Sequence, residues 1–378
     1  MRIGIDARLN AYRYGGIPQY TYQLSAALVE QSSSDQFVLL QHWRQRKPLL
    51  PMAQVQRATL VTPPHHRLER YSLALEVWPR QLDLLHCPDM VVPRLCPCPT
   101  VVTIHDLAFV RYPYILDQAA QRYYHQVFES IWRASAVIAV SEATRRDIVH
   151  VLGRPAAQID VVYEAAAPSF RPLSLPDGDT RSFASGLARG RAYTLTSGEF
   201  VLFVSTLEPR KNIPTLLQAV HICCKRPANP PYRLVLAGAR GWHDDGIFKL
   251  VHRLGLDDVV VFLGGVDQET LLWLYNACRV YVNPSLYEGF GLPVLEAMAC
   301  GAPSLVSHTS SLPEVAGSAA VLLAPLDTVA WADALEHIWH NADERASRRQ
   351  QGLVQAARFS WQQAARETLA IYRRLVLQ

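Results

Sequence analysis

Short apolar runs alternate with amphipathic stretches along most of the chain. In the first half, the stretches that predict helices most clearly are 20–30, 118–134 and 142–152, the last with Ser141 as its expected N-cap. The apolar runs that predict strands are 2–6, 36–42, 59–62, 84–87, 100–105, 136–140 and 159–163. Because strands that alternate with helices pair in parallel, the pattern predicts an α/β fold with parallel sheets.

The alternation stops after Pro168 and resumes at Phe200. The segment 169–199 is rich in Pro, Gly, Ser and charged residues, which predicts a linker or variable segment. A second series of strands follows, at 200–205, 233–237, 259–263, 280–283, 304–306 and 321–323. We therefore expect two Rossmann-like domains, at 1–168 and 200–360. Such sheets bind ligands beyond the carboxyl ends of their strands, so the predicted active site lies in a cleft between the two domains.

The most informative motif joins a strand of the second series to a helix. It reads N-P-S-L-Y-E-G-F-G-L-P-V-L-E-A-M-A-C-G, from Asn283 to Gly301. Gly289 and Gly291 allow a tight turn, and Pro293 suits the first turn of the helix that carries Glu296. The N-terminus of such a helix favours an anion such as a nucleotide diphosphate. A polar loop that only caps an ordinary helix is the simpler alternative.

A second motif, S-T-L-E-P-R-K-N, follows the first strand of the second series at 205–212. Arg210 and Lys211 stand on its strand-to-helix loop, where two cations can neutralise a diphosphate leaving group. Adjacent basic residues at a helix start can also simply be solvated.

The first half carries weaker signals. Gly15 and Gly16 form a turn that can meet a phosphate or an acceptor, although any tight turn could use them. His105 stands at the carboxyl end of a buried strand in V-V-T-I-H-D-L. It lies either beside the reaction centre or at an ordinary strand end, with its ring nitrogens hydrogen-bonded within the protein. Glu142 is explained equally well by helix capping.

The two motifs of the second half resemble those of retaining glycosyltransferase family 4 (group 1) enzymes, in a mannosyltransferase-like form. The resemblance rests on E-G-F-G-L-P-V-L-E, in which seven residues separate the two glutamates, and on E-P-R-K-N. It implies that Glu296 binds the ribose, that Glu288 contacts the transferred sugar, and that Arg210 and Lys211 bind the diphosphate. The further donor-binding and catalytic positions that it implies are Gly16, His105, Val266, Gly289, Phe290, Gly291 and Leu292.

The resemblance also implies a GT-B fold, in which the closing helix 361–377 joins the first domain, and a reaction that retains the anomeric configuration. Two positions depart from the family pattern: Thr206, where many relatives have arginine, and Pro18, at a position that is small in relatives. No D-x-D sequence ends a predicted strand, and the cations and the helix end supply positive charge, so we expect no metal and no other cofactor.

Composition agrees with this class. The chain has 378 residues, enough for two cores, of which 49% are hydrophobic and 19% charged. It starts at once with a strand-like run, it has no long apolar segment, and its seven cysteines lack zinc-site spacing; these features predict a reduced, cytoplasmic protein. A net charge of +4 is too small to indicate nucleic-acid binding. Basic runs at 44–47 and 65–70 suggest peripheral contact with an anionic membrane, or else are solvated loops.

The sequence thus predicts an enzyme that moves a hexose, most simply mannose from GDP-mannose, to a glycan or lipid-linked acceptor in cell-surface polysaccharide synthesis. Two alternatives remain open at this point. One is a nucleotide-sugar 2-epimerase of the same architecture, and the other is a non-catalytic subunit that binds a sugar nucleotide.

Overall fold

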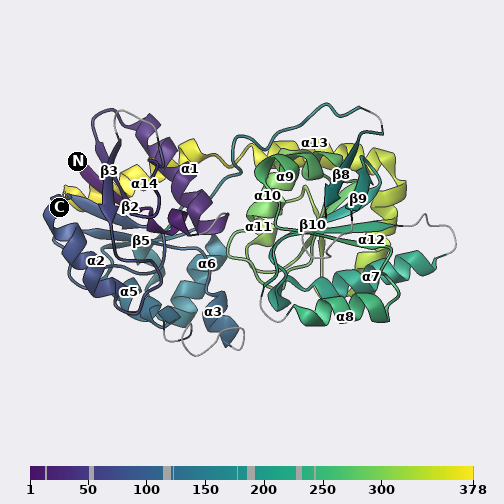
Figure 1. The fold of residues 1–378 in the computed structure, drawn as a ribbon, viewed down its shortest axis with the longest axis horizontal. Helices are drawn as coiled ribbons and strands as arrows, with labels where there is room; N and C mark the ends of the chain where they lie inside the picture. Colours follow the sequence, from purple (N-terminus) through teal and green to yellow (C-terminus); the bar gives the residue numbers. More distant parts are fainter. Residues whose placement is uncertain are drawn as a thin grey trace. The chain divides into compact units, whose positions relative to one another are not determined.

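The computed structural model divides the chain into two compact units, drawn in Figure 1. Unit 1 comprises Met1–Ala165 and Ser360–Gln378, and unit 2 comprises Ala166–Phe359. The structure describes residues 1–12, 15–50, 55–113, 121, 123–176, 178–184, 192–226, 232–241 and 244–377.

Unit 1 is built on a seven-stranded sheet in which all neighbouring strands are parallel, in the order β3-β2-β1-β4-β5-β6-β7. This confirms the predicted parallel sheet, with strand ends within a residue or two of the predicted ones except at β3, which begins and ends earlier. The strands are β1 (Arg2–Asp6), β2 (Gln36–His42), β3 (Val55–Leu60), β4 (Leu84–Cys87), β5 (Thr100–Ile104), β6 (Ala136–Ala139) and β7 (Ile159–Val161).

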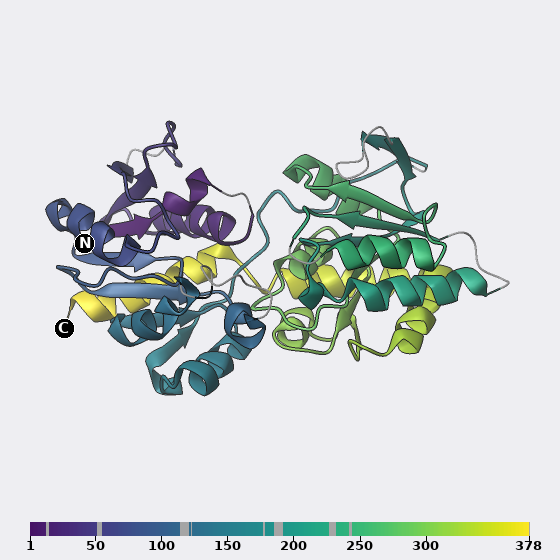
Figure 2. The ribbon, with the colours of Figure 1, turned by 60° about the horizontal axis from the view of Figure 1, so that its bottom comes forward.

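The helices of unit 1 cover both faces of this sheet. Apolar side chains of α2 and α5 belong to one buried cluster with the sheet, and α1 packs against α14, the closing helix (Figures 1 and 2). Ser141 caps α6 by accepting the Thr144 N–H, as predicted, but α6 ends early and continues as one π-helical turn, Ile148–Leu152. The helices are α1 (Gly16–Gln31), α2 (Glu69–Val77), α3 (Ala108–Arg111), α5 (Gln126–Arg133), α6 (Glu142–Asp147) and α14 (Trp361–Val376). The 118–125 part of the predicted helix 118–134 lies partly outside the described residues.

A buried polar chain fastens α14 to the sheet of unit 1. The Tyr372 hydroxyl lies 2.6 Å from His86 Nδ1, and His86 Nε2 lies 2.8 Å from Thr103 Oγ1. Tyr20 of α1 reaches the same threonine hydroxyl, at 3.1 Å. Burial lowers the pKa of His86 to about 3, so this imidazole is neutral at physiological pH.

Unit 2 repeats the architecture with six parallel strands, in the order β12-β11-β10-β13-β14-β15. Helices α7, α8 and α12 pack together, whereas α9, α10, α11 and α13 form a second group across the sheet (Figure 1). The strands are β10 (Phe200–Val204), β11 (Arg233–Ala237), β12 (Val260–Gly264), β13 (Val280–Asn283), β14 (Ser304–Ser307) and β15 (Val321–Leu323). The helices are α7 (Ile213–Lys225), α8 (Asp245–Arg253), α9 (Gln268–Ala277), α10 (Leu292–Ala299), α11 (Leu312–Ala316), α12 (Thr328–His340) and α13 (Ala342–Ala356).

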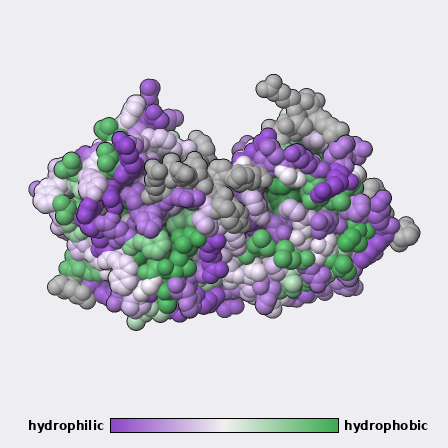
Figure 3. Space-filling model, turned by 90° about the horizontal axis from the view of Figure 1, so that it is seen from below, coloured by the Kyte–Doolittle hydropathy of each residue, from purple (hydrophilic) through white to green (hydrophobic). Residues whose placement is uncertain are grey.

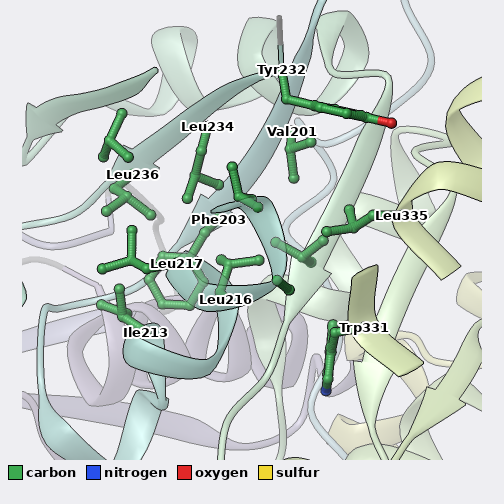
Figure 4. Close-up of a cluster of buried hydrophobic side chains, with 14 of the residues drawn as sticks. Val201, Phe203, Ile213, Leu216, Leu217, Tyr232, Leu234, Leu236, Trp331 and Leu335 are labelled. Atoms are coloured by element: carbon green, nitrogen blue, oxygen red, sulfur yellow. The ribbon is translucent and has the colours of Figure 1, made fainter. Parts of the chain in front are cut away.

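A large buried cluster of unit 2 lies between its sheet and the α7–α12 pair. Figure 4 shows strand side chains meeting helix side chains there, with the labelled residues Val201, Phe203, Ile213, Leu216, Leu217, Tyr232, Leu234, Leu236, Trp331 and Leu335. Burial of this many large apolar groups is the main stabilising contribution to the unit.

The segment 169–199, predicted as a linker or variable segment, contains an antiparallel pair of strands, β8 (Thr180–Ala184) and β9 (Ala192–Thr196). Phe183 of β8 packs on Trp273 of α9, with ring centroids 5.5 Å apart, and Asp179 accepts a hydrogen bond from the indole N–H of Trp273 at 2.7 Å. No strands were predicted in this segment, because the pair is anchored by an aromatic residue about 90 positions away, which local composition does not reveal.

Hydrophilic and hydrophobic side chains are interspersed on the face drawn in Figure 3. Among the described residues, no helix is long and apolar enough to cross a lipid bilayer.

Candidate active site

Except for Gly16, which lies in unit 1, the predicted donor-binding residues lie on loops at the carboxyl ends of the unit 2 strands or on the start of α10. Pro209–Lys211 forms a 3-10 turn after β10, and the glutamate motif follows β13. The two loops are joined directly, because the Leu286 N–H donates to the Arg210 carbonyl at 2.8 Å. In a parallel sheet these ends share one edge, which is why Lys211 and Glu288, 77 positions apart, meet.

Lys211 and Glu288 form a buried ion pair at this edge. Lys211 Nζ lies 2.7 Å from Glu288 Oε1 and 2.9 Å from Oε2, and both side chains are less than a tenth exposed. The Ser285 hydroxyl donates to Glu288 Oε1 at 2.8 Å. Burial alone would raise the pKa of Glu288, but the charges of Lys211 and Arg210 together with these hydrogen bonds hold it below its usual value. The carboxylate is therefore ionised.

Burial acts on the lysine in the opposite sense. Burial and the nearby Arg210 charge lower the pKa of Lys211, and Glu288 partly opposes them. Because the ammonium contacts both carboxylate oxygens, the pair remains charged on both sides.

Arg210 is positioned by three acceptors. Its Nε donates to Glu208 at 3.0 Å, and Nη1 donates to the Tyr287 carbonyl at 3.2 Å and to Glu288 at 3.3 Å. Two cations therefore surround the Glu288 carboxylate. Arg210, Lys211 and Glu288 together carry a net positive charge, which Glu208 balances. Sequence reasoning placed both cations correctly at the strand end but did not foresee that they contact Glu288.

A polar segment after β14 holds the glutamate loop, and the sequence analysis missed it. Ser310 accepts the Glu288 N–H at 2.9 Å, while Ser311 donates to the carbonyls of Glu288 and Phe290 at 3.0 and 2.6 Å. Thr309 donates to the Ser285 carbonyl at 3.0 Å. The signal was available, since S-H-T-S-S directly follows the predicted strand 304–306 and such ends line the ligand-binding edge.

The glutamate loop ends in a glycine that the backbone requires. Gly291 is the N-cap of α10 with φ of +110°, and a Cβ built on it would lie 2.8 Å from Leu312 Cδ2. Gly289 and Phe290 precede it, and Leu292 is the first helical residue, followed by Pro293. The strand, loop and helix predicted from the motif are thus confirmed.

Glu296 lies half-buried on α10, where the hydroxyl of Tyr275 donates to its Oε2 at 2.9 Å. Tyr275 is buried on α9, and its ring meets Phe170 edge-on at 5.6 Å. The tyrosine fixes one carboxylate oxygen of Glu296. It was not predicted, because an aromatic on an amphipathic helix carries no distinctive signal.

Two further loops reach the same edge. Val266 follows β12 and precedes Asp267, which caps α9. Gly238 follows β11 with φ of +157°, and a Cβ there would lie 1.8 Å from the Ser205 carbonyl oxygen. Glycine at position 238 therefore lets the loops after β10 and β11 approach each other. Trp242 of the predicted L-A-G-A-R-G-W loop lies outside the described residues.

In unit 1, His105 follows β5 at the carboxyl edge of that sheet. Its Nδ1 lies 2.8 Å from Glu164, and its Nε2 lies 2.9 Å from the Pro88 carbonyl. Both partners accept hydrogen bonds, so both ring nitrogens donate and the imidazole is protonated. Burial would lower the pKa of His105, but Glu164 and the carbonyl raise it above the usual value. Tyr20 packs edge-on against the ring at 4.6 Å.

Gly16 is the first residue of α1, and it and Gly15 have φ of +50° and +78°. The preceding Arg13 and Tyr14 of the predicted loop lie outside the described residues. Within the described part of the chain, no three His, Cys, Asp or Glu side chains gather as a metal site. One Asp-Gly-Asp sequence occurs at 177–179; its Asp179 bonds Trp273, and its Asp177 lies outside the described residues.

Comparison with known proteins gives two family matches that together span most of the chain. Residues 14–168 match the model described as Glycosyltransferase Family 4, and residues 193–354 match Glycosyl transferases group 1. The chain is 35% identical over 297 residues to O-antigen chain mannosyltransferase B of Escherichia coli, covering 77% of this chain and 74% of that protein.

It is also 29% identical over 286 residues to the serotype-specific mannosyltransferase WbdA of Escherichia coli, covering 74% of this chain and 34% of WbdA. Among solved structures, Anabaena Alr3699/HepE in complex with UDP and glucose superposes with a TM-score of 0.73 at 18% identity, covering 99% of this chain and 100% of that one. This likeness supports the two-domain Rossmann-like fold.

Proposed function

The chain belongs to glycosyltransferase family 4 and is a GT-B glycosyltransferase, and from that premise we propose that it transfers mannose from GDP-mannose to a growing cell-surface polysaccharide. The names of its relatives support the sugar and the product, since O-antigen chain mannosyltransferase B and WbdA are both described as mannosyltransferases. The complex of HepE with UDP and glucose supports a nucleotide-sugar donor as the substrate class.

The observation that carries the proposal is the contact of Lys211 with both oxygens of Glu288 at the strand edge. In the proposed complex the donor diphosphate lies against Lys211 and Arg210, and a sugar hydroxyl donates to Glu288. Lys211 then bridges the sugar-binding carboxylate and the leaving group. As the glycosidic bond breaks, negative charge grows on the phosphate, so the two cations stabilise the transition state more than the ground state.

The other donor contacts follow the family motif. Glu296, oriented by Tyr275, accepts hydrogen bonds from the ribose hydroxyls. The backbone from Gly289 to Leu292 holds sugar or phosphate oxygens, Val266 borders the base through its main chain, and Gly16 approaches the phosphates. The protonated His105 donates toward the transferred sugar only if one of its present bonds is exchanged, so we propose that it acts chiefly by charge.

We propose that the reaction retains configuration and needs no metal. The bond from the sugar C1 to the phosphate oxygen breaks, a bond from C1 to the acceptor oxygen forms on the same face, and the acceptor proton passes to the departing phosphate. Lys211 and Arg210 supply the charge that a divalent cation supplies in metal-dependent transferases.

The test is transfer from a panel of GDP-, UDP-, ADP- and dTDP-sugars to a mannose oligosaccharide in the presence of EDTA, with the product anomer read by NMR. We expect turnover with GDP-mannose, an α-linked product, and strong loss in Glu296→Gln. Glu269→Gln, a change at an exposed residue of α9, is the matched control. Preference for another base or sugar, inversion, or abolition by EDTA would refute the corresponding part of the proposal.

Transfer to a lipid-linked acceptor would bring the enzyme to a membrane surface, and unit 1 has residues suited to that contact. Leu68, Leu75 and Trp78 are exposed directly before, within and directly after α2, and Leu68 stands beside the exposed Arg67. We propose peripheral binding to anionic bilayers through this face. Flotation with anionic vesicles tests it, and equal recovery of wild type and Leu75→Asp with the vesicles would contradict it.

A further inference from the structure

Two cysteines stand two positions apart in the segment between β4 and β5. The sequence there is L-C-P-C-P, at 95–99, and its cysteines are Cys96 and Cys98. Their sulfur atoms lie 3.6 Å apart, in hydrogen-bond contact. The pair lies just before β5 begins at Thr100, whereas His105 follows the other end of that strand. The transfer chemistry therefore leaves these two thiols unused.

The pair is open to small reagents, unlike most of the other cysteines. Cys96 and Cys98 are each partly exposed, and the proline between them is exposed as well. Of the five remaining cysteines, Cys224 on α7 is exposed, and the other four are buried: Cys87, Cys223, Cys278 and Cys300. The chain therefore has one place where two neighbouring thiols are both partly exposed.

Hydrogen bonds fix the backbone on both sides of the pair. Before it, the Arg94 N–H donates to the Arg70 carbonyl at 2.7 Å, and the Arg94 carbonyl accepts from Arg133 at 2.7 Å. After it, the Pro99 carbonyl accepts the Leu85 N–H at 3.0 Å, where β4 begins to pair with β5. The proline between the cysteines restricts one further backbone angle. The short loop thus holds the two sulfurs near each other.

The sulfur contact makes the two thiols unequal. A hydrogen bond from the Cys98 thiol, with a second from the Cys98 backbone N–H, lowers the pKa of Cys96 to about 7, although burial opposes this. The sulfur contact and burial raise the pKa of Cys98. The backbone N–H points only at the Cys96 sulfur, which is why Cys96 is the one that ionises. Since the thiolate is the nucleophile, Cys96 reacts first.

Only a small movement separates the two thiols from a disulfide. The sulfurs have to approach by about 1.5 Å to reach the bonded distance of about 2.05 Å. Rotation of two partly exposed side chains can supply this movement. A disulfide between cysteines two positions apart closes a very small ring, so it adds little stability and belongs to the labile disulfides that form and break reversibly.

We propose that Cys96 and Cys98 form a redox-active dithiol that small disulfides of the glutathione class oxidise reversibly. The Cys96 thiolate attacks one sulfur of the small disulfide, and the other sulfur leaves as a thiolate. Cys98 then loses its proton and attacks the Cys96 sulfur of the mixed disulfide, which releases the second small thiol. In total, two protein thiols are oxidised to one disulfide and one small disulfide is reduced to two thiols. The site is independent of the proposed transfer reaction.

The test exposes the folded full-length protein to oxidised and then to reduced glutathione, blocks free thiols with N-ethylmaleimide, and analyses tryptic peptides by mass spectrometry. Trypsin releases the peptide 95–111, which contains Cys96 and Cys98 and no other cysteine. In oxidised glutathione we expect this peptide to be unblocked and to lack the mass of two hydrogen atoms, and in reduced glutathione to be blocked twice. The peptide 212–225, with adjacent Cys223 and Cys224, is the internal control and should form no disulfide within itself.

Serine variants separate the roles of the two thiols. Cys98→Ser should accumulate a glutathione adduct on Cys96, because no second thiol resolves it, and Cys96→Ser should stay mostly unreacted. At pH 7 a pKa near 7 leaves about half of a thiol ionised, against about 1% for a pKa near 9, and the lower nucleophilicity of the less basic thiolate reduces this advantage to roughly fivefold. Cys96 should therefore be alkylated by iodoacetamide about fivefold faster than Cys224, whose pKa is raised by burial. Unchanged thermal unfolding of both variants shows that they are folded.

Three results would overturn the proposal. Wild type could keep both thiols free in oxidised glutathione, it could stop at a glutathione adduct, or the disulfide could join the peptide 95–111 to the peptide 81–94, which contains Cys87. If Cys98 in Cys96→Ser reacts as fast as Cys96 does in wild type, the assignment of Cys96 as the nucleophile is wrong.

Discussion

The buried pair of Lys211 and Glu288 makes a prediction about stability that is separate from catalysis. Lys211→Met keeps the length and packing of the side chain but leaves Glu288 buried with its charge only partly compensated, by Arg210 at 3.3 Å and by Ser285. Removing one partner of a buried ion pair typically costs about 3–5 kcal/mol. Because those two contacts remain, we expect the lower end, about 3 kcal/mol.

For a unit of this size, 1 kcal/mol corresponds to about 2–4 °C in Tm, so the transition of unit 2 should fall by about 6–12 °C. Scanning calorimetry without nucleotide measures this shift. The double variant Lys211→Met/Glu288→Gln removes the stranded charge and should recover at least about half of the loss.

Glu344→Gln, which breaks a more exposed i,i+4 pair with Arg348, is the control and should cost no more than about 0.5 kcal/mol. If Lys211→Met melts within about 2 °C of wild type, its destabilisation is less than about 1 kcal/mol, and the reasoning is refuted. A double variant that is less stable than Lys211→Met would also refute it, because the carboxylate would then not be the source of the cost.

Three further outcomes are expected. Gly238→Ala places a Cβ 1.8 Å from the Ser205 carbonyl oxygen and should destabilise unit 2 by at least about 2 kcal/mol in urea unfolding, whereas Gly246→Ala on α8, with nothing within 4 Å, should be neutral or stabilising. Tyr372→Phe removes the hydroxyl on His86 and should lower the stability of unit 1 by about 1–3 kcal/mol; an unchanged midpoint would show that the buried bond contributes nothing. The pKa of His86 is about 6.5 in the unfolded chain and about 3 in the folded one, so between these pH values only the unfolded chain binds the proton. The free energy of unfolding is therefore unaffected by this group above about pH 6.5 and falls by about 1.4 kcal/mol for each pH unit below it. The raised pKa of His105 acts in the opposite sense: it stabilises the folded state below about pH 6.5, and this stabilisation is lost as pH rises through the folded pKa. Urea unfolding midpoints of wild type and of His86→Gln, measured between about pH 4.5 and 7.5, separate the two effects. If the midpoint changed with pH equally steeply in both proteins, the His86 assignment would be contradicted.

The positions of site residues that follow strands could be predicted from the sequence. The residues that act through contacts with side chains or loops distant in the sequence could not. Periodicity located both sheets, and the motifs located Lys211 and Glu288 on loops after strands and Glu296 on the helix that follows, because those positions depend only on the order of elements. Ser310, Ser311 and Tyr275 were missed, since their roles depend on which loop lies next to theirs in space. The β8–β9 pair was missed for the same reason, because Trp273 anchors it from another element.

The return of α14 to unit 1 has a consequence for the order in which the protein folds during synthesis. Tyr372 and the helix that packs on α1 are translated only after the whole of unit 2. Unit 2 can therefore fold from a continuous stretch of chain, while the nascent unit 1 waits with the His86 ring and one face of α1 uncovered. The first unit to emerge from the ribosome is therefore the last to be completed.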